Sequence, residues 1–329
     1  YVGKCNLMGG MTSQVAETLI VVAGECFTDE TEVMTEHGFV SFSELKQDDK
    51  VLQINESMQG EFVKPVAIIR KNFTGKLVGH ETLTTHTLTT PNHNLVFKTI
   101  KGKVFKQKAS DKVSSGWLIP KTTTVSGNGI NLSNDEIKLI LAVCADGSLR
   151  NRVVGNNAVH LSFIKERKVN RLKGILERLK ISYTSYVNTY DNGKTYTTFN
   201  FILPDYIVDK NIPKSWLVDA TLQQRLFILE ELRYWDGHYQ EKKRSMEFTS
   251  KHLDECLFVQ ELAHTAGLYA SVRHRTNQYG EWYRCCVSYS MKNATTQSLY
   301  TYEKNYSGNV YCVTVPSGMI LTRHKGKVT

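Results

Sequence analysis

The chain lacks a long apolar segment, a signal peptide and any paired cysteine motif. No apolar run approaches the roughly 18 to 20 residues that a membrane-spanning helix needs. The apolar stretch AETLIVVAG near the start has neither a basic region before it nor a cleavage box after it. The 7 cysteines are odd in number and none stands in a CxxC or Cys/His box, which indicates neither a disulfide framework nor a zinc site. We therefore expect a cytoplasmic protein without a membrane partner.

The composition is typical of a folded protein, and the net charge favours an anionic partner. Apolar residues make up 41% of the 329 residues and charged residues 22%, which is ordinary for a globular chain. This length exceeds what one core usually organises, so two domains, or one domain interrupted by another, are expected. The net charge of +9 favours an anionic partner, of which nucleic acid is the commonest.

Two kinds of pattern alternate along the sequence. From Cys26 to about Lys121, short runs rich in β-branched residues are separated by Gly, Asp and Asn, which predicts an all-β module. The stretch TTTVSGNGINLSND then precedes a helical period at DEIKLILAVCADGSL. Strand-like sequence returns at NVYCVTVPSGMILTRHKGKV. The β module is therefore expected to open and close the chain around an α/β insert.

The insert contains a repeat in which each copy ends a helical segment in Asp-Gly. KLILAVCADGSL contains Asp146 and ILEELRYWDGHY contains Asp236, and a short strand, a lysine (Lys165 or Lys251) and a further helix follow each. A single Asp-Gly is typical of a helix C-cap and turn. Because both Asp-Gly copies are followed by the same elements, the repeat favours one site to which both aspartates contribute.

These features resemble the two-motif LAGLIDADG homing endonucleases, over roughly residues 131 to 290. The resemblance implies that the two motif helices pack side by side and that Asp146 and Asp236 bind Mg²⁺ at the minor groove of double-stranded DNA. Carboxylates suit this chemistry because phosphodiester hydrolysis places hard cations between water, phosphate and leaving oxygen. Leu141 and Glu231 stand where the family usually has a glycine for close helix contact.

Further residues of the insert are candidates for contacts to DNA. Lys165 and Lys251 would stabilise phosphate charge, although a solvated lysine is the plainer interpretation of each. YTSYVNTYDNGKTYTTFNF predicts a hairpin around Asp191-Asn192-Gly193. Basic residues near the first acid (Arg150, Arg152, Arg167, Lys168, Arg171 and Lys173) and the segments EKKRS and SVRHR near the second predict phosphate contacts beside sheets that read the major groove.

The flanking segments resemble the Hint fold of inteins, over about residues 26 to 121 and 305 to 329. Cys26 stands where an intein begins, and TTPNHNLVF places Thr90 and His93 as in the family's TxxH motif. GNVYCVTVP resembles a later motif, with Cys312 where aspartate is commoner. The plainer interpretations are a buried structural cysteine and a core histidine.

The intein resemblance implies acyl chemistry at Cys26. Its thiolate would attack the carbonyl of Glu25 and convert the amide to a thioester, while His93 protonates the departing nitrogen. Thr90 would orient the histidine or the amide, and Cys312 would assist the later step. The sequence ends before the family's closing His-Asn pair, so full splicing is not expected.

Together these patterns predict a monomeric, multidomain protein: an all-β Hint splicing domain split by an inserted α+β LAGLIDADG endonuclease domain with two αββαββα-like halves. Its expected function is self-splicing without a cofactor, on a flanking extein polypeptide, and Mg²⁺-dependent double-strand cleavage of an intein-less gene. The alternatives are an autoprocessing element whose insert binds DNA without cutting it, and a thiol peptidase. The expected boundaries are an extein flank at 1–25, Hint segments at 26–129 and 296–329, and the endonuclease at 130–295.

Overall fold

The computed structural model describes residues 25–150, 158–278 and 280–329, which fall into two compact units. Unit 1 contains the described residues up to Thr123 together with Met291–Thr329, and unit 2 contains those from Thr124 to Ser290. The expected flank therefore lies outside the described residues except for Glu25. Among the described residues no helix is long and apolar enough to cross a membrane.

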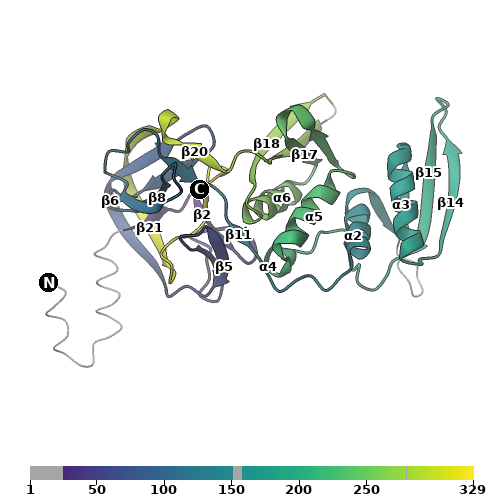
Figure 1. The fold of residues 1–329 in the computed structure, drawn as a ribbon, viewed down its shortest axis with the longest axis horizontal. Helices are drawn as coiled ribbons and strands as arrows, with labels where there is room; N and C mark the ends of the chain where they lie inside the picture. Colours follow the sequence, from purple (N-terminus) through teal and green to yellow (C-terminus); the bar gives the residue numbers. More distant parts are fainter. Residues whose placement is uncertain (1–24, 151–157, 279) are drawn as a thin grey trace. The chain divides into compact units, whose positions relative to one another are not determined.

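Unit 1 is built of antiparallel strands from both ends of the chain. The long strands β6 (Ala67–Glu81) and β21 (Tyr300–Thr314) pair along their whole length. With β1 (Phe27–Thr28) and β7 (His86–Thr89) they close into a ring in the order β1-β21-β6-β7. Figure 1 shows the purple first strands and yellow last strands within this unit.

Two further sheets complete unit 1. One has the order β20-β10-β8-β9, and the other contains the path β5-β4-β2-β22-β23, with β3 paired to β2. The elements are β2 (Thr31–Thr35), β3 (Gly38–Ser41), β4 (Val51–Ile54), β5 (Gln59–Val63), β8 (Asn94–Lys98), β9 (Val104–Lys108), β10 (Leu118–Pro120), β20 (Asn293–Thr295), η3 (Thr296–Ser298), β22 (Thr322–His324) and β23 (Lys327–Val328). Inward-facing apolar side chains such as Phe27, Val51 and Tyr311 form one core cluster, as the period-two alternation of half-buried strands requires.

Unit 2 contains two copies of one order: helix, two strands, helix, two strands. The first copy comprises α2 (Asn134–Asp146), β12 (Gly147–Arg150), β13 (Ala158–Phe163), α3 (Glu166–Arg178), β14 (Tyr183–Thr189) and β15 (Thr195–Ile202). The second comprises α5 (Leu222–Leu232), β16 (Gly237–Gln240), η2 (Glu241–Lys243), β17 (Ser245–Ser250), α6 (Leu253–Thr265), β18 (Tyr269–Asn277) and β19 (Gly280–Ser288). The sheets have matching orders, β12-β13-β15-β14 and β16-β17-β19-β18; β11 (Thr124–Val125) and α4 (Trp216–Asp219) precede one copy each.

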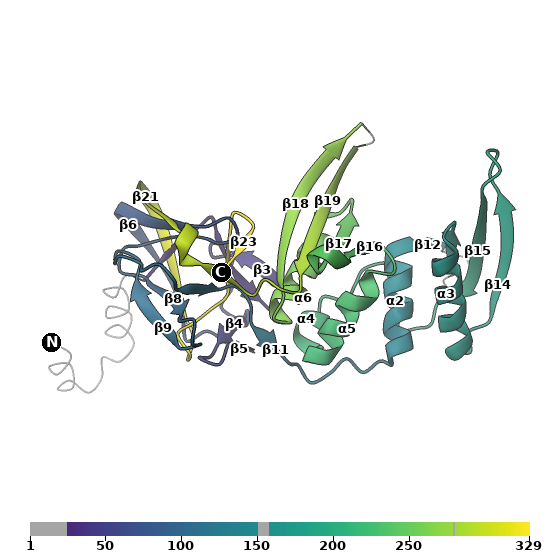
Figure 2. The same ribbon diagram turned by 45° about the horizontal axis from the view of Figure 1, so that its top comes forward.

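Helices occupy the middle of unit 2, and the two sheets lie outside them. Figures 1 and 2 both show α2 beside α5, with α3 and α6 next to the sheets of their own copies. The apolar period of the sequence explains this packing, because Leu172 and Ile175 of α3 are buried, as are Val259 and Leu262 of α6. The ends of α2 and α5 therefore belong to one helical layer.

The expected fold class needs correction. The described residues form mostly β structure in several sheets, with five α-helices, α2 to α6. Alternating apolar residues specify strands and their buried faces, but they do not specify which distant strands pair, as β6 and β21 do. The expected αββαββα order is present from α2 to α4, whereas in the second copy the next described strand, β20, follows β19 without an α-helix between them.

A buried ion pair links the two copies. Glu231 of α5 is 2% exposed and accepts hydrogen bonds from Arg171 Nε at 2.8 Å and Trp235 Nε1 at 2.9 Å. The Arg171 guanidinium also lies 3.7 Å from the centre of the Tyr234 ring. The acid that replaces the glycine expected at this position is therefore neutralised by a cation from the other copy.

Replacing Arg171 by methionine should destabilise unit 2 by about 3 kcal/mol, because it leaves a buried carboxylate without its cation. Arg178→Met is the matched control on the same helix. Arg178 donates to Asp135 at 2.8 Å, but its side chain is 54% exposed, and loss of such a surface pair costs less than about 1 kcal/mol. Urea unfolding measures both; equal losses would contradict the role assigned to the Arg171–Glu231 pair.

Candidate functional site

Both predicted acids lie at close junctions between a helix and a strand. Asp146 is the last residue of α2, and Gly147 begins β12 directly after it. A Cβ on Gly147 would lie 2.5 Å from the Val143 carbonyl oxygen, and one on Gly237 would lie 2.5 Å from the Arg233 Cα. Gly147 has φ −72°, so it is not the left-handed C-cap of the plainer interpretation. In both copies the absence of a side chain on glycine lets the start of the strand lie close to the end of the helix, and this fixes the position of the acid before the glycine.

The two acids converge on one lysine that the sequence interpretation did not single out as a site residue. Lys168 of α3 places its Nζ 2.6 Å from Asp146 Oδ2 and 3.7 Å from Asp236 Oδ1. Lys168 is only 8% exposed. An ammonium group therefore stands between carboxylates from different copies.

The position of Lys168 had a signal in the sequence. It precedes Leu172 by four residues and Ile175 by seven, and both are buried on α3. A lysine on the apolar face of an amphipathic helix points toward the interior, where it needs an anionic partner. The predicted Lys165 lies instead at the start of this helix and is exposed.

The electrostatics of the acid pair favour a cation. Burial raises the pKa of Asp236, the nearby Asp146 raises it further, and Lys168 opposes both effects. The described residues contain no group of three or more His, Cys, Asp or Glu side chains that could hold a metal. Mg²⁺, however, is often held by one or two carboxylates together with substrate phosphates and water. Two carboxylates already arranged around an ammonium group fit that requirement.

Asp236 also opens onto a cleft within unit 2. The cleft has a volume of about 540 Å³, and its lining includes Asp236, Thr249, Lys251, Lys210 and Glu255. The predicted Lys251 therefore shares a cleft with an acid, whereas Lys165 is not part of the lining. The lining carries three acids, since Asp254 belongs to it as well, and two lysines, so the cleft presents charges of both signs.

The outer faces of the two sheets differ in charge. Arg273 and Arg284 lie opposite each other on β18 and β19, and Arg275 is exposed further along β18. On the first sheet, His160 contacts Asn200 at 3.1 Å and Ser162 contacts Thr198 at 2.9 Å. The face in the second copy carries these three arginines, of which Arg284 pairs with Glu247 at 3.4 Å, whereas these contacts in the first copy join neutral polar groups.

Much of the positive charge expected around the first acid is already paired. Arg167 donates to the Tyr234 carbonyl at 2.5 Å, Arg171 binds Glu231, and Lys168 binds the two acids. Arg152 lies outside the described residues. The basic surface that remains for a partner is thus concentrated in the second copy.

In unit 1 the structure brings together the other four predicted residues. The Cys26 amide donates to Thr90 Oγ1 at 3.0 Å, and the Thr90 amide donates to the Cys26 carbonyl at 3.0 Å. The pairing of Phe27 with Tyr311 sets Cys26 beside Cys312. Glu25, His93 and Cys312 line one cavity of about 190 Å³.

Burial suppresses ionisation in this cluster. It raises the pKa of Cys26 and raises that of Cys312 to about 12. It lowers the pKa of His93 to about 4, and a hydrogen bond with the Glu25 backbone only partly opposes this. Near pH 7 both thiols are therefore protonated and His93 is neutral, so the thiolate required by the expected acyl shift is not the resting form.

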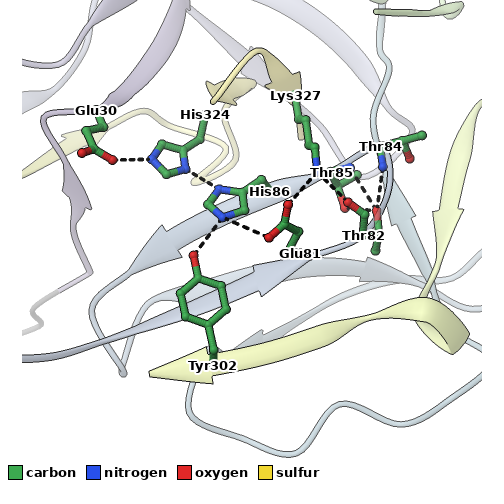
Figure 3. A network of polar contacts seen from close by, with 9 residues as sticks. All are labelled: Glu30, Glu81, Thr82, Thr84, Thr85, His86, Tyr302, His324 and Lys327. Carbon is green, nitrogen blue, oxygen red and sulfur yellow. Dashed lines mark hydrogen bonds and ion pairs between the residues drawn. The ribbon is translucent and has the colours of Figure 1, made fainter. Parts of the chain in front are cut away.

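A second histidine cluster lies between the strands of unit 1. Figure 3 shows the Nδ1 atoms of His86 and His324 facing each other. Nε2 of His86 contacts the Tyr302 hydroxyl, and Nε2 of His324 contacts the Glu30 carboxylate. Burial and the neighbouring His324 lower the pKa of His86 to about 4, and burial also lowers that of His324. Both rings are therefore neutral near pH 7, and the network joins β7, β21 and β22.

Comparison with known proteins gives one curated relative over most of the chain. No family model matches. The chain is 27% identical over 346 residues to "Ribonucleoside-diphosphate reductase subunit beta" of Aquifex aeolicus (strain VF5), an alignment that covers 92% of this chain. The alignment covers 49% of that protein, so the chain spans about half the length of its relative. The relative is named as a subunit of an enzyme.

Several solved structures share weak similarity with about half of the chain. One is "The crystal structure of I-DmoI in complex with DNA and Ca", with a TM-score of 0.37 and 12% identity, covering 49% of this chain and 85% of that one. Another is the N-terminal LAGLIDADG domain of DUF199/WhiA, with a TM-score of 0.36 and 13% identity, covering 48% and 77%. At these TM-scores the similarities support no inference for this chain.

The curated relative corrects the identification made from sequence. The protein that matches 92% of the chain is named as a reductase subunit, not as an intein or a protein-splicing element. The intein identification, its Hint label and the combined splicing and homing function are therefore withdrawn. The short motifs around Cys26, Thr90 and His93 were too few to fix a family. Their catalytic roles, like those of the insert residues, stay predictions.

Buried histidines predict acid sensitivity of unit 1. His80 lines the cavity that Glu25, His93 and Cys312 also line, and neither of its ring nitrogens has a hydrogen-bond partner among the described residues. Burial lowers its pKa from 6.5 to about 4. Between these values the unfolded chain binds the proton and the folded chain does not. Stability should therefore fall as the pH drops from about 6.5 toward 4.

His80→Leu should remove one proton from this linkage and reduce the slope of the free energy of unfolding by up to about 1.4 kcal/mol per pH unit. Urea unfolding at a series of pH values measures the slope. His37→Leu is the control, because the His37 side chain is 65% exposed, and it should leave the slope unchanged. An unchanged slope in His80→Leu would show that His80 is not held neutral in the folded protein.

Proposed function

We propose that unit 2 binds double-stranded DNA and hydrolyses its phosphodiester bonds with Mg²⁺ held by Asp146 and Asp236. The observation that carries this proposal is the convergence of two carboxylates, one from each copy, on a single cation. Convergence of this kind supports chemistry that needs a hard cation between two carboxylates. The proposal includes double-stranded DNA as the partner and Mg²⁺ as the cofactor. It also includes a protein that acts as a monomer in the cytoplasm.

The residues of unit 2 have distinct tasks in this function. Asp146 and Asp236 would hold the cation, which would supply activation of water and neutralisation of charge on the leaving oxygen. Lys210 and Lys251 line the cleft beside Asp236 and attract the phosphate. The exposed arginines Arg273 and Arg275 on β18 supply phosphate contacts, which contribute affinity without reading sequence. Base contacts then fall to the neutral polar face of the first sheet.

The curated relative favours a second candidate, a part of a ribonucleoside-diphosphate reductase subunit. Its support is the 27% identity over nearly the whole chain. It is the weaker candidate because the reductase name describes a protein twice as long as the match, so the activity in that name belongs to the longer chain. The geometry of Asp146, Lys168 and Asp236 favours the first.

Cleavage should require Mg²⁺, and Asp146→Asn or Asp236→Asn should lower its rate by orders of magnitude while DNA affinity stays nearly unchanged, because phosphate contacts elsewhere carry binding. The assay incubates the full chain with a randomised duplex library and sequences the ends produced. Binding is measured separately in Ca²⁺ by fluorescence anisotropy across salt concentrations.

Asp205→Asn is the matched control, since Asp205 is an exposed acid in the segment that joins the two copies, and it should cut normally. Arg273→Ala should reduce the salt dependence of binding by about one counterion. The proposal fails if DNA is bound but never cut with Mg²⁺ or Mn²⁺, or if Asp236→Asn cuts normally. Turnover of ribonucleoside diphosphates by the same sample, without DNA cleavage, would favour the second candidate.

A further inference from the structure

We propose that Lys168 is a built-in counter-ion: its ammonium group holds the position between Asp146 and Asp236 and competes there with a divalent cation. The inference rests on the proposed function, because it concerns regulation of the same site. It assigns to Lys168 a positioning role that keeps the acids converged while no metal is bound. Lys168 thereby raises the metal concentration at which a divalent cation occupies the site.

The geometry gives Lys168 access to both acids at once. Its Nζ donates a hydrogen bond to Asp146 at 2.6 Å and lies 3.7 Å from Asp236. Its side chain is 10% exposed, whereas those of Asp146 and Asp236 are 24% and 33% exposed. The lysine approaches from the protein side, which leaves part of each carboxylate open to solvent and to a ligand.

The repeat explains why one lysine serves both acids. Aligning the buried positions of α3 and α6, Leu172 with Val259 and Ile175 with Leu262, places Glu255 at the position of Lys168. Glu255 accepts a hydrogen bond from Ser250 Oγ at 2.6 Å and lines the cleft with Asp236. The second copy thus adds another acid where the first has its lysine. Glu255 lies near enough to Asp236 to raise the pKa of that acid further, which Lys168 opposes.

The charges make the ammonium group and a divalent cation rivals. Two cations that share one pair of carboxylates repel each other strongly at short range, so metal bound by both acids requires the ammonium group to move away. The lysine stem has four carbons and many rotamers, which permits that movement. Removing the ammonium group should therefore tighten metal binding and weaken the metal-free protein.

The test titrates the full chain with Mn²⁺ alone, without DNA, and measures free Mn²⁺ by electron paramagnetic resonance. Lys168→Met should lower the Mn²⁺ dissociation constant by about tenfold or more, and Lys168→Arg should stay near the wild-type value. Lys173→Met is the control, because Lys173 is an exposed lysine on the same helix, and it should change nothing. An unchanged or weakened affinity in Lys168→Met would overturn the inference.

A stability measurement separates competition from a merely structural role. In EDTA, Lys168→Met should lower the melting temperature, and Mn²⁺ should restore more of it than in the wild type. In an Asp146→Asn background, Lys168→Met should lower the melting temperature by less, because only one carboxylate then needs the cation. An equal loss with and without Mn²⁺, and in both backgrounds, would overturn the inference, as it would mean that Lys168 only fills space.

The outcomes distinguish this inference from the proposed function. If Asp146→Asn/Asp236→Asn binds Mn²⁺ as the wild type does, the cation site of the proposed function is wrong and the inference falls with it. If the wild type cuts DNA and loses Mn²⁺ binding in that double variant, while Lys168→Met binds Mn²⁺ as the wild type does, the inference alone is wrong.

Discussion

The arrangement of unit 2 depends on two partly buried carboxylates that cannot lie together without a cation. Asp146 and Asp236 come from different copies and meet on the ammonium group of Lys168. Their meeting requires α2 and α5 to lie in contact, and glycines that let a strand begin beside each helix end. It also requires a cation for Glu231 on α5, which Arg171 supplies. Charge balance between the copies thus fixes the geometry of the site.

The buried histidines and cysteines of unit 1 are neutral, in contrast to the charged groups at the site in unit 2. The cavity beside Cys26 and the network around His86 consist of neutral histidines and protonated thiols near pH 7, because burial disfavours their charged forms. The hydrogen bonds between Cys26 and Thr90 hold β1 against β7 without any charge. This cluster of four residues is pre-arranged, but its resting protonation states are not those of a nucleophile and its acid.

Sequence patterns indicated that Asp146 and Asp236 would lie near each other, whereas they did not indicate which distant strands pair. The Asp-Gly repeat located both acids, and the turn at Gly193, which has φ +78°, lies where the hairpin was expected. Lys168 was placed only among surface basic residues, because local sequence does not show that a helix face will meet a second helix. The pairing of β6 with β21 is equally invisible in local sequence. Family recognition went wrong because it rested on short motifs spread over a long chain.

The most direct test of the central claim is anomalous diffraction from crystals of the full chain grown with Mn²⁺. We expect an anomalous peak that both Asp146 and Asp236 contact, with the Lys168 side chain turned away from its position between them. A map with the Lys168 ammonium group still bridging the two acids and no peak between them, at Mn²⁺ concentrations that support DNA cleavage, would contradict it.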